Sequence, residues 1–224
     1  MPVVNHETKE VQFKLVFSGP AMSGKTSNVA YVHRVLDESQ RGDLISLNTS
    51  ADRTLFFDYL PMSPVVMNGY QTKFLLYTVP GQVVYNATRE LVLRGVDGLV
   101  FVADSDPQRW EANNEAWRNL LATLQNNGRD LAEIPLVFQY NKRDLADAVP
   151  MGQLEDALNP GRRPSLEAVA HAGHGVMETL DCLSSEVLTR FQQSLQHQEE
   201  RRAGAGNHPH QDSVRSNSNA ASTW

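Results

Sequence analysis

Four residues near the start of the chain have the types and the spacing of a phosphate-binding loop. Gly19, Gly24, Lys25 and Thr26 fit the pattern G-x-x-x-x-G-K-[ST] at every fixed position. In such a loop, consecutive backbone N–H groups cradle phosphate oxygens at the start of a helix whose dipole favours an anion. Lys25 would reach the β- and γ-phosphates of a nucleotide, and the Thr26 hydroxyl would be a ligand of Mg²⁺. The alternative is a chance glycine-rich turn.

The elements around this loop favour the phosphate-binding interpretation. Alternating apolar residues at 11–17 predict a strand that leads into the loop, and helical spacing at 26–39 predicts a helix that follows it. Because strands then alternate with helices, we expect an α/β fold with ligand-binding loops at the carboxyl ends of parallel strands. The further strands are expected at residues 44–47, 52–61, 69–79, 98–104, 135–140 and 166–170, and the further helices at 85–94, 109–127, 151–158 and 175–198.

A second polar segment, Asn141-Lys142-Arg143-Asp144, follows the buried strand pattern at 135–140. The Asp144 carboxylate can accept two hydrogen bonds from the N1–H and the N2 amino group of guanine, and adenine offers neither in that arrangement. The Asn141 side chain and the Lys142 stem would brace the loop and cover the ring. Alone, the tetrapeptide is also typical of a polar loop. At the end of a buried strand that follows a phosphate loop, it favours GTP over ATP.

Length and composition are those of an ordinary globular protein. The chain has 224 residues, of which 41% are hydrophobic and 21% are charged, and its formal net charge is −6. This charge gives no broad electrostatic reason to expect nucleic acid or an anionic membrane as a partner. We expect no membrane span, no secretory signal and no lipid anchor, so a partner would have to bring the protein to a membrane. The single cysteine, Cys182, fits a reducing cytosol.

Three parts are expected along the chain. Residues 1–10 are a leader or a short extra strand, residues 11–198 are the nucleotide-binding domain, and residues 199–224 are a disordered tail. From about residue 201 onward the tail contains no Leu, Ile or Phe, so it cannot build a hydrophobic core.

With both motifs in place, the chain resembles the Ras-like small GTPases, and more closely the bacterial gliding-motility polarity GTPases of the MglA type. The resemblance covers roughly residues 11–191. It implies a Ras-like G domain with a mostly parallel six-stranded sheet, helices on both faces, and GTP hydrolysis with Mg²⁺. The segments that carry the closer match are 44–47, 52–58, 77–82 (Tyr-Thr-Val-Pro-Gly-Gln), 95–98, 102–105 and 139–145.

The resemblance also implies roles for residues outside the two motifs. Thr54 resembles the first-switch threonine that closes onto Mg²⁺ and the γ-phosphate, and Gly81 resembles the second-switch glycine that senses that phosphate. Gln82 resembles the glutamine that orients the attacking water, and Arg53 resembles an arginine finger supplied in cis, which is worth about 10³–10⁵ in rate. Taken alone, Arg53 also fits a surface ion pair, and Gln82 a solvated turn.

The backbone of Ala170 lies where the family places its last guanine-contacting loop. The expected catalytic residues are Gln82 and Arg53, and the expected metal ligands are Thr26 and Thr54. The expected nucleotide-binding residues are Gly19, Ala21, Met22, Ser23, Gly24, Lys25, Thr26, Ser27, Thr54, Gly81, Asn141, Lys142, Asp144 and Ala170.

Two positions depart from the family pattern. Most Ras-like proteins have an aspartate three residues before the switch glycine, where this chain has Thr78, a loss that the polarity branch shares. Asp52 or Asp58 would then help to hold Mg²⁺. The third loop position, usually glycine, is Ala21, and Met22 follows it. A Cβ at that position approaches the space where the catalytic groups align around the γ-phosphate. Because small misplacements there cost about 10²-fold, we expect slow hydrolysis.

The leading interpretation is a monomeric, cytoplasmic switch whose two switch segments are ordered by GTP and released by hydrolysis. The resemblance implies a Roadblock-type GTPase-activating protein, effectors in cell polarity or motility, and recruitment to a cell pole by partners. A nucleotide-bound scaffold with negligible hydrolysis is the main alternative. A third is an ATP-using phosphotransferase, against which Asp144 argues.

Overall fold

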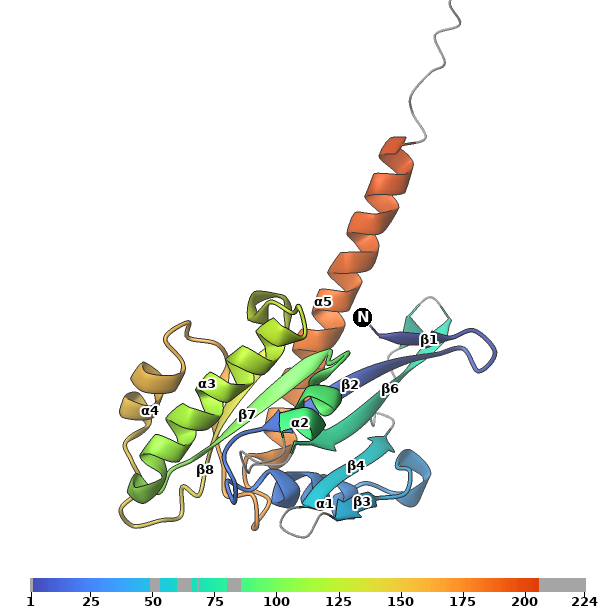
Figure 1. Cartoon of the computed structure of the whole chain (residues 1–224). Coiled ribbons are helices and arrows are strands. Elements are labelled where there is room, and N and C mark those ends of the chain that lie inside the picture. The colour runs from blue at the N-terminus through green and yellow to red at the C-terminus, as the bar shows by residue number, and fades with distance from the viewer. Residues whose placement is uncertain (1, 49–52, 60–65, 68, 80–85, 206–224) are drawn as a thin grey trace, which may run out of the picture. The chain divides into compact units, whose positions relative to one another are not determined.

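A computed structural model of the chain describes residues 2–48, 53–59, 66–67, 69–79 and 86–205 (Figure 1). The chain divides into two compact units, Met1–Thr189 and Arg190–Trp224. The first unit contains every residue that we expect to bind a nucleotide. The described part of the second unit is the C-terminal part of one helix.

A mostly parallel β-sheet lies at the centre of the first unit. The described strands are β1 (Val3–Asn5), β2 (Glu10–Ser18), β3 (Ile45–Asn48), β4 (Arg53–Tyr59), β5 (Val66–Met67), β6 (Tyr70–Thr78), β7 (Gly98–Asp104), β8 (Leu136–Asn141) and β9 (Ser165–Glu167). Their order is β3-β4-β6-β2-β7-β8-β9, with β1 paired to β2 and β5 paired to β6. From β6 to β9 all neighbours are parallel, whereas β3, β4, β1 and β5 pair in the antiparallel sense.

The predicted α/β fold is confirmed. The six strands β4-β6-β2-β7-β8-β9 form the mostly parallel sheet that we expected, and β3, β1 and β5 extend it within the described ranges. All positions of β7 and β8 are buried, as expected for strands in the middle of a parallel sheet. The carboxyl ends of β2, β7 and β8 therefore meet at one edge, where ligands bind in open α/β sheets.

Helices cover both faces of the sheet. Gly98 and Phe101 lie three positions apart in β7, so they point to opposite faces. The Phe101 ring lies edge-on to Trp117, with the ring centroids 5.1 Å apart. On the other face, a Cβ at Gly98 would lie 2.6 Å from Cγ2 of Val187, so α5 (Val176–Ala205), the helix that carries Val187, packs directly on β7. The described α-helices are α1 (Lys25–Val35), α2 (Asn86–Leu93), α3 (Trp110–Asn126), α4 (Met151–Leu158) and α5 (Val176–Ala205).

Three terminal features refine the predictions. Strand β1 is the short extra strand considered for residues 1–10. Strand β9 ends at Glu167, before the expected residue 170, because the N–H of Val169 turns to donate to the carbonyl of His174 (3.0 Å). Helix α5 continues to Ala205, past the expected end at residue 198, since residues 191–202 are rich in Gln, Glu and Arg, which favour helices.

The disordered tail predicted for residues 199–224 is wrong for 199–205, which belong to α5, and residues 206–224 lie outside the described residues. In the part of the chain that is described, every helix is too short or too polar to cross a lipid bilayer.

Candidate nucleotide-binding site

The two fixed glycines of the phosphate-loop pattern stand where the fold leaves no room for a side chain. Gly19 has a φ of 140°, and a Cβ there would lie 2.2 Å from the carbonyl oxygen of Val102 in β7. Gly24 has a φ of 102°, and its Cβ would lie 2.1 Å from Nδ2 of Asn141 at the end of β8. The glycines therefore let the loop between β2 and α1 pass close to the ends of two neighbouring strands.

Lys25 is the first residue of α1 and lies under the loop. Its Nζ donates to the carbonyl oxygens of Gly19 (3.1 Å) and Pro20 (2.6 Å), and the residue is 6% exposed. These contacts fix the ammonium group beside the backbone that would surround the phosphates. A cation at this place favours an anionic ligand.

The start of α1 supplies backbone donors. Thr26 and Ser27, both half-buried, precede the first bond within the helix, which runs from the N–H of Asn28 to the carbonyl of Gly24 (2.9 Å). The first N–H groups of a helix have no partner inside the helix, and the helix dipole makes them a site for anions. The loop and the helix therefore join in one phosphate-binding element.

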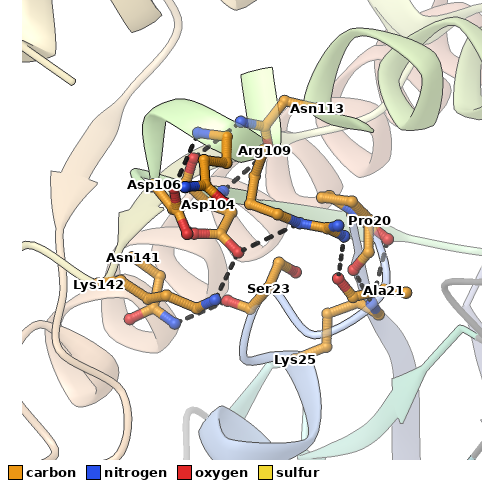
Figure 2. A network of polar contacts seen from close by, with 12 residues as sticks. Pro20, Ala21, Ser23, Lys25, Asp104, Asp106, Arg109, Asn113, Asn141 and Lys142 are labelled. Atoms are coloured by element: carbon orange, nitrogen blue, oxygen red, sulfur yellow. Dashed lines mark hydrogen bonds and ion pairs between the residues drawn. The ribbon is translucent and has the colours of Figure 1, made fainter. Parts of the chain in front are cut away.

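Two side chains from later segments hold the outer side of the loop, and Figure 2 shows both. Nη2 of Arg109 donates to the carbonyl oxygen of Ala21 (2.9 Å), and Nδ2 of Asn141 donates to the carbonyl oxygen of Ser23 (2.7 Å). Because C=O and N–H of one trans peptide point in opposite directions, carbonyls held outward turn the following N–H groups inward.

Asn141 also joins the expected base-binding loops. Its Oδ1 accepts a hydrogen bond from the N–H of Ala170 (2.8 Å), and its side chain is nearly buried, at 3% exposure. One amide thus contacts Ser23 on one side and Ala170 on the other. The backbone of Ala170, for which we expected a contact with guanine, donates its N–H to Asn141.

Lys142 and Asp144 point to different environments. Lys142 has a φ of 65°, and its Nζ lies 2.5 Å from Oδ2 of Asp104, a carboxylate at the end of β7 with no exposure. Asp144 is exposed, so its carboxylate is accessible to a base. Arg143, which lies between these two residues, anchors the loop: its Nη1 donates to the carbonyl of Val149 (2.7 Å).

The expected switch residues are described only in part. Arg53 and Thr54 belong to β4, opposite Asn48 and Leu47 of β3, and their backbone alone is described. Gly81 and Gln82 lie outside the described residues. The roles of the expected catalytic residues therefore stay predictions.

Thr78 ends β6 beside the phosphate loop. The residue is fully buried and pairs in register with Phe17, two residues before Gly19. A neutral hydroxyl therefore lies at the end of β6.

The donor set fits Mg²⁺ bound mainly through the nucleotide. Among the described residues there is no group of three or more His, Cys, Asp and Glu side chains that could hold a metal ion in the absence of a nucleotide. Mg²⁺ usually keeps several waters and takes one or two protein oxygens together with phosphate oxygens. The hydroxyl of Thr26, placed at the start of α1, is an oxygen of this kind.

A cavity of about 310 Å³ opens beside the loop, between Ala21, α2 and α3. Two arginines line it, Arg89 and Arg109, together with the carboxylate-bearing Glu115. Burial lowers the pKa of the Arg89 guanidinium, and Glu115 opposes this shift. The wall next to Ala21 is therefore cationic, because an arginine stays protonated even when its pKa falls.

The sequence predictions missed Arg109 and Asp104. The available signal was the position of Asp104: an ionisable residue that is buried at the end of an apolar strand pattern needs a cation as partner. Its partners, Arg109 and Lys142, follow different stretches of the chain, and spacing alone does not reveal which cation reaches it.

Comparison with known proteins agrees with this geometry. A curated relative, the Mutual gliding-motility protein MglA of Myxococcus xanthus (strain DK1622), is 48% identical over 191 residues, which cover 85% of this chain and 98% of the relative. No family model matches the chain.

Proposed function

The chain belongs to the MglA-type family of Ras-like small GTPases, and on this premise we propose that it is a molecular switch that binds GTP and hydrolyses it to GDP. The observation that carries the proposal is the double contact of Asn141 with Ser23 and Ala170. It supports a single ligand that spans the phosphate loop and the base loop, as a guanine nucleotide would.

We assign the parts of the nucleotide as follows. The N–H groups of the loop and of Thr26 and Ser27 bind phosphate oxygens, and Lys25 places its charge beside the β- and γ-phosphates. Asp144 accepts hydrogen bonds from guanine and so excludes adenine. Lys142 covers the base with its stem while its ammonium pairs with Asp104.

Thr26 and Thr54 are the residues that would hold Mg²⁺ with the phosphates. When bound, the ion neutralises charge that develops on the phosphate oxygens.

For hydrolysis we propose that Gln82 orients the attacking water and that Arg53 offsets charge in the transition state. The half-buried Ala21 borders the cationic cavity, and we propose that its Cβ crowds the space where these two groups align. The proposed switch is therefore slow on its own, because the alignment of the catalytic groups is imperfect.

The proposed partners follow from the family. A Roadblock-type activating protein would position Arg53 and Gln82 without supplying an arginine, and effectors would read the order of the two switch segments. The proposed process is cell polarity or gliding motility, and the name of the Myxococcus relative states gliding motility. We place the protein in the cytoplasm as a monomer that partners recruit to a cell pole.

One feature, the Cβ of Ala21, favours a second candidate function, a nucleotide-bound scaffold with negligible turnover. The two functions differ in what an activator and the nucleotide state change. A switch shows accelerated hydrolysis with its activator and different effector affinities with GDP and with GTP, whereas a scaffold shows neither.

The test begins with purified full-length protein. The bound nucleotide is released and identified by chromatography, and single-turnover hydrolysis of GTP is then measured with and without a Roadblock-type protein. We expect guanine nucleotide, a slow basal rate and a faster activated rate. Bound adenine nucleotide would contradict the base assignment, and a rate that no activator changes would favour the scaffold.

A further inference from the structure

Arg109 is a cation at the phosphate loop that the proposed mechanism does not use. It ends the short 3-10 helix η3 (Pro107–Arg109) ahead of α3, and its side chain is 34% exposed. Nη2 donates to the carbonyl oxygen of Ala21 at 2.9 Å, and Nε lies 3.9 Å from Oδ2 of Asp104 (Figure 2). The guanidinium therefore bridges the loop and the end of β7.

Asp104 is a rigid anchor for this arginine. Its backbone exchanges two hydrogen bonds with the Asn113 side chain: its N–H donates to Oδ1 (2.9 Å), and its carbonyl accepts from Nδ2 (2.8 Å). Its carboxylate accepts from the N–H of Asp106 (3.1 Å) and from Nζ of Lys142 (2.5 Å). A fully buried carboxylate is stable only when it is paired, so its cationic neighbours are constrained in place.

The peptide that Arg109 holds leads into a strained residue. Met22 has a φ of 62°, a conformation that costs a non-glycine residue about 1–2 kcal/mol, and its side chain extends into solvent at 84% exposure. Such a conformation persists when surrounding contacts impose it. The side chain of Met22 is too exposed to impose it, whereas Arg109 fixes the carbonyl of the preceding peptide.

We propose that Arg109 is a positioning residue for phosphate binding. By holding the carbonyl of Ala21 outward, it turns the N–H of Met22 into the concave side of the loop, where successive N–H groups form a nest for an anion. Asn141 acts in the same way on the carbonyl of Ser23. The inference rests on the proposed binding of a guanine nucleotide. The ligand that the positioned loop would bind is a nucleoside diphosphate or triphosphate.

The shared carboxylate of Asp104 gives this role a second consequence. Nζ of Lys142, in the base loop, lies 2.5 Å from Oδ2 of Asp104, and Nε of Arg109, which holds the phosphate loop, lies 3.9 Å from the same atom. The buried carboxylate of Asp104 therefore connects the base loop, through Lys142, with the phosphate loop, through Arg109.

The test compares Arg109→Ala, Arg109→Lys and Arg118→Ala in the full-length protein. Arg118 is the matched control, because it also lies at α3 and pairs with a carboxylate, Glu111 (2.7 Å), but at an exposed position away from the loop. The measurements are the affinity for GDP, the amide ¹⁵N–¹H signal of Met22 in the GDP complex, and the melting temperature without nucleotide.

We expect Arg109→Ala to weaken GDP binding about tenfold, the low end for a hydrogen bond to a charged group at a partly exposed site, and to shift the Met22 amide signal. Arg109→Lys should lose about threefold, because an ammonium group cannot span the carbonyl and Asp104 as a planar guanidinium does. Arg118→Ala should bind GDP like the wild type.

The proposal is overturned if Arg109→Ala keeps GDP affinity within twofold of the control while its melting temperature falls, since Arg109 would then be purely structural. If the alanine variant does not fold, Arg109→Lys decides: wild-type affinity with an unmoved Met22 signal refutes the proposal. If neither the wild type nor any variant hydrolysed GTP, the proposed switch function would be refuted. The test of Arg109 would still stand, because it measures GDP binding.

Discussion

The substitution Asn141→Ala should lower the free energy of unfolding more than the replacement of an exposed Asn or Gln side chain by alanine. The side chain is 3% exposed and makes two buried hydrogen bonds, to the carbonyl of Ser23 (2.7 Å) and from the N–H of Ala170 (2.8 Å). Asn141→Ala leaves both backbone groups without these partners. At about 1–3 kcal/mol for each buried group left unsatisfied, the free energy of unfolding should fall by about 2–6 kcal/mol, with entering water favouring the lower end.

The assay is urea unfolding of nucleotide-free protein, followed by far-UV circular dichroism, so that lost ligand does not add to the difference. Asn114→Ala is the matched control, because Nδ2 of Asn114 donates to the carbonyl of Trp110 (3.0 Å) within α3 at a partly buried position. Its cost should be about 1 kcal/mol or less.

A second measurement connects stability to the site. Saturating GDP raises the free energy of unfolding by an amount that grows with affinity, and this gain should be smaller for Asn141→Ala than for the control. Equal losses in the two variants, together with equal gains from GDP, would refute the view that Asn141 joins the two loops.

Three further outcomes are expected. Ala21→Gly should raise single-turnover GTP hydrolysis by up to about 10²-fold, and equal rates would contradict a brake at this Cβ. Asp144→Asn should weaken GTP binding by about 10²–10⁴-fold, since it removes up to two charge-assisted hydrogen bonds, and competition by ATP should then rise; unchanged selectivity would locate base recognition elsewhere. Gly98→Ala should lower the free energy of unfolding by about 1–3 kcal/mol, because its Cβ would lie 2.6 Å from Val187 and 3.0 Å from Leu15, and an unchanged urea midpoint would refute this close packing.

Local patterns predicted the buried elements well. The bounds of β7 and α4 agree with those expected, because a continuous apolar run and a helix start after Pro150 are both local signals. The end of β9 was misjudged, since the turn at Val169 depends on a backbone contact with His174 that apolar patterning does not encode. Pattern alone also placed the end of α5 too early, before Ala205.

The candidate site divides in a similar way. The motifs identified Lys25 and Asn141 because fixed spacings record where a loop meets a helix or strand. Arg109 was missed because it reaches Ala21 across 88 positions of sequence, through the crossover that brings β7 beside β2. The roles of Thr54 and Gln82 came from resemblance and stay predictions.

The cluster of Asp104, Arg109 and Lys142 limits how such a sequence can drift. Replacing the acid alone leaves two cations facing each other near the loop, and replacing either cation weakens the pairing of a carboxylate that has no access to water. A single substitution at any of the three positions should therefore lower stability or nucleotide affinity. We expect related chains that differ here to differ at the acid and at least one cation together, so that an alignment of the family would show these positions changing as a group.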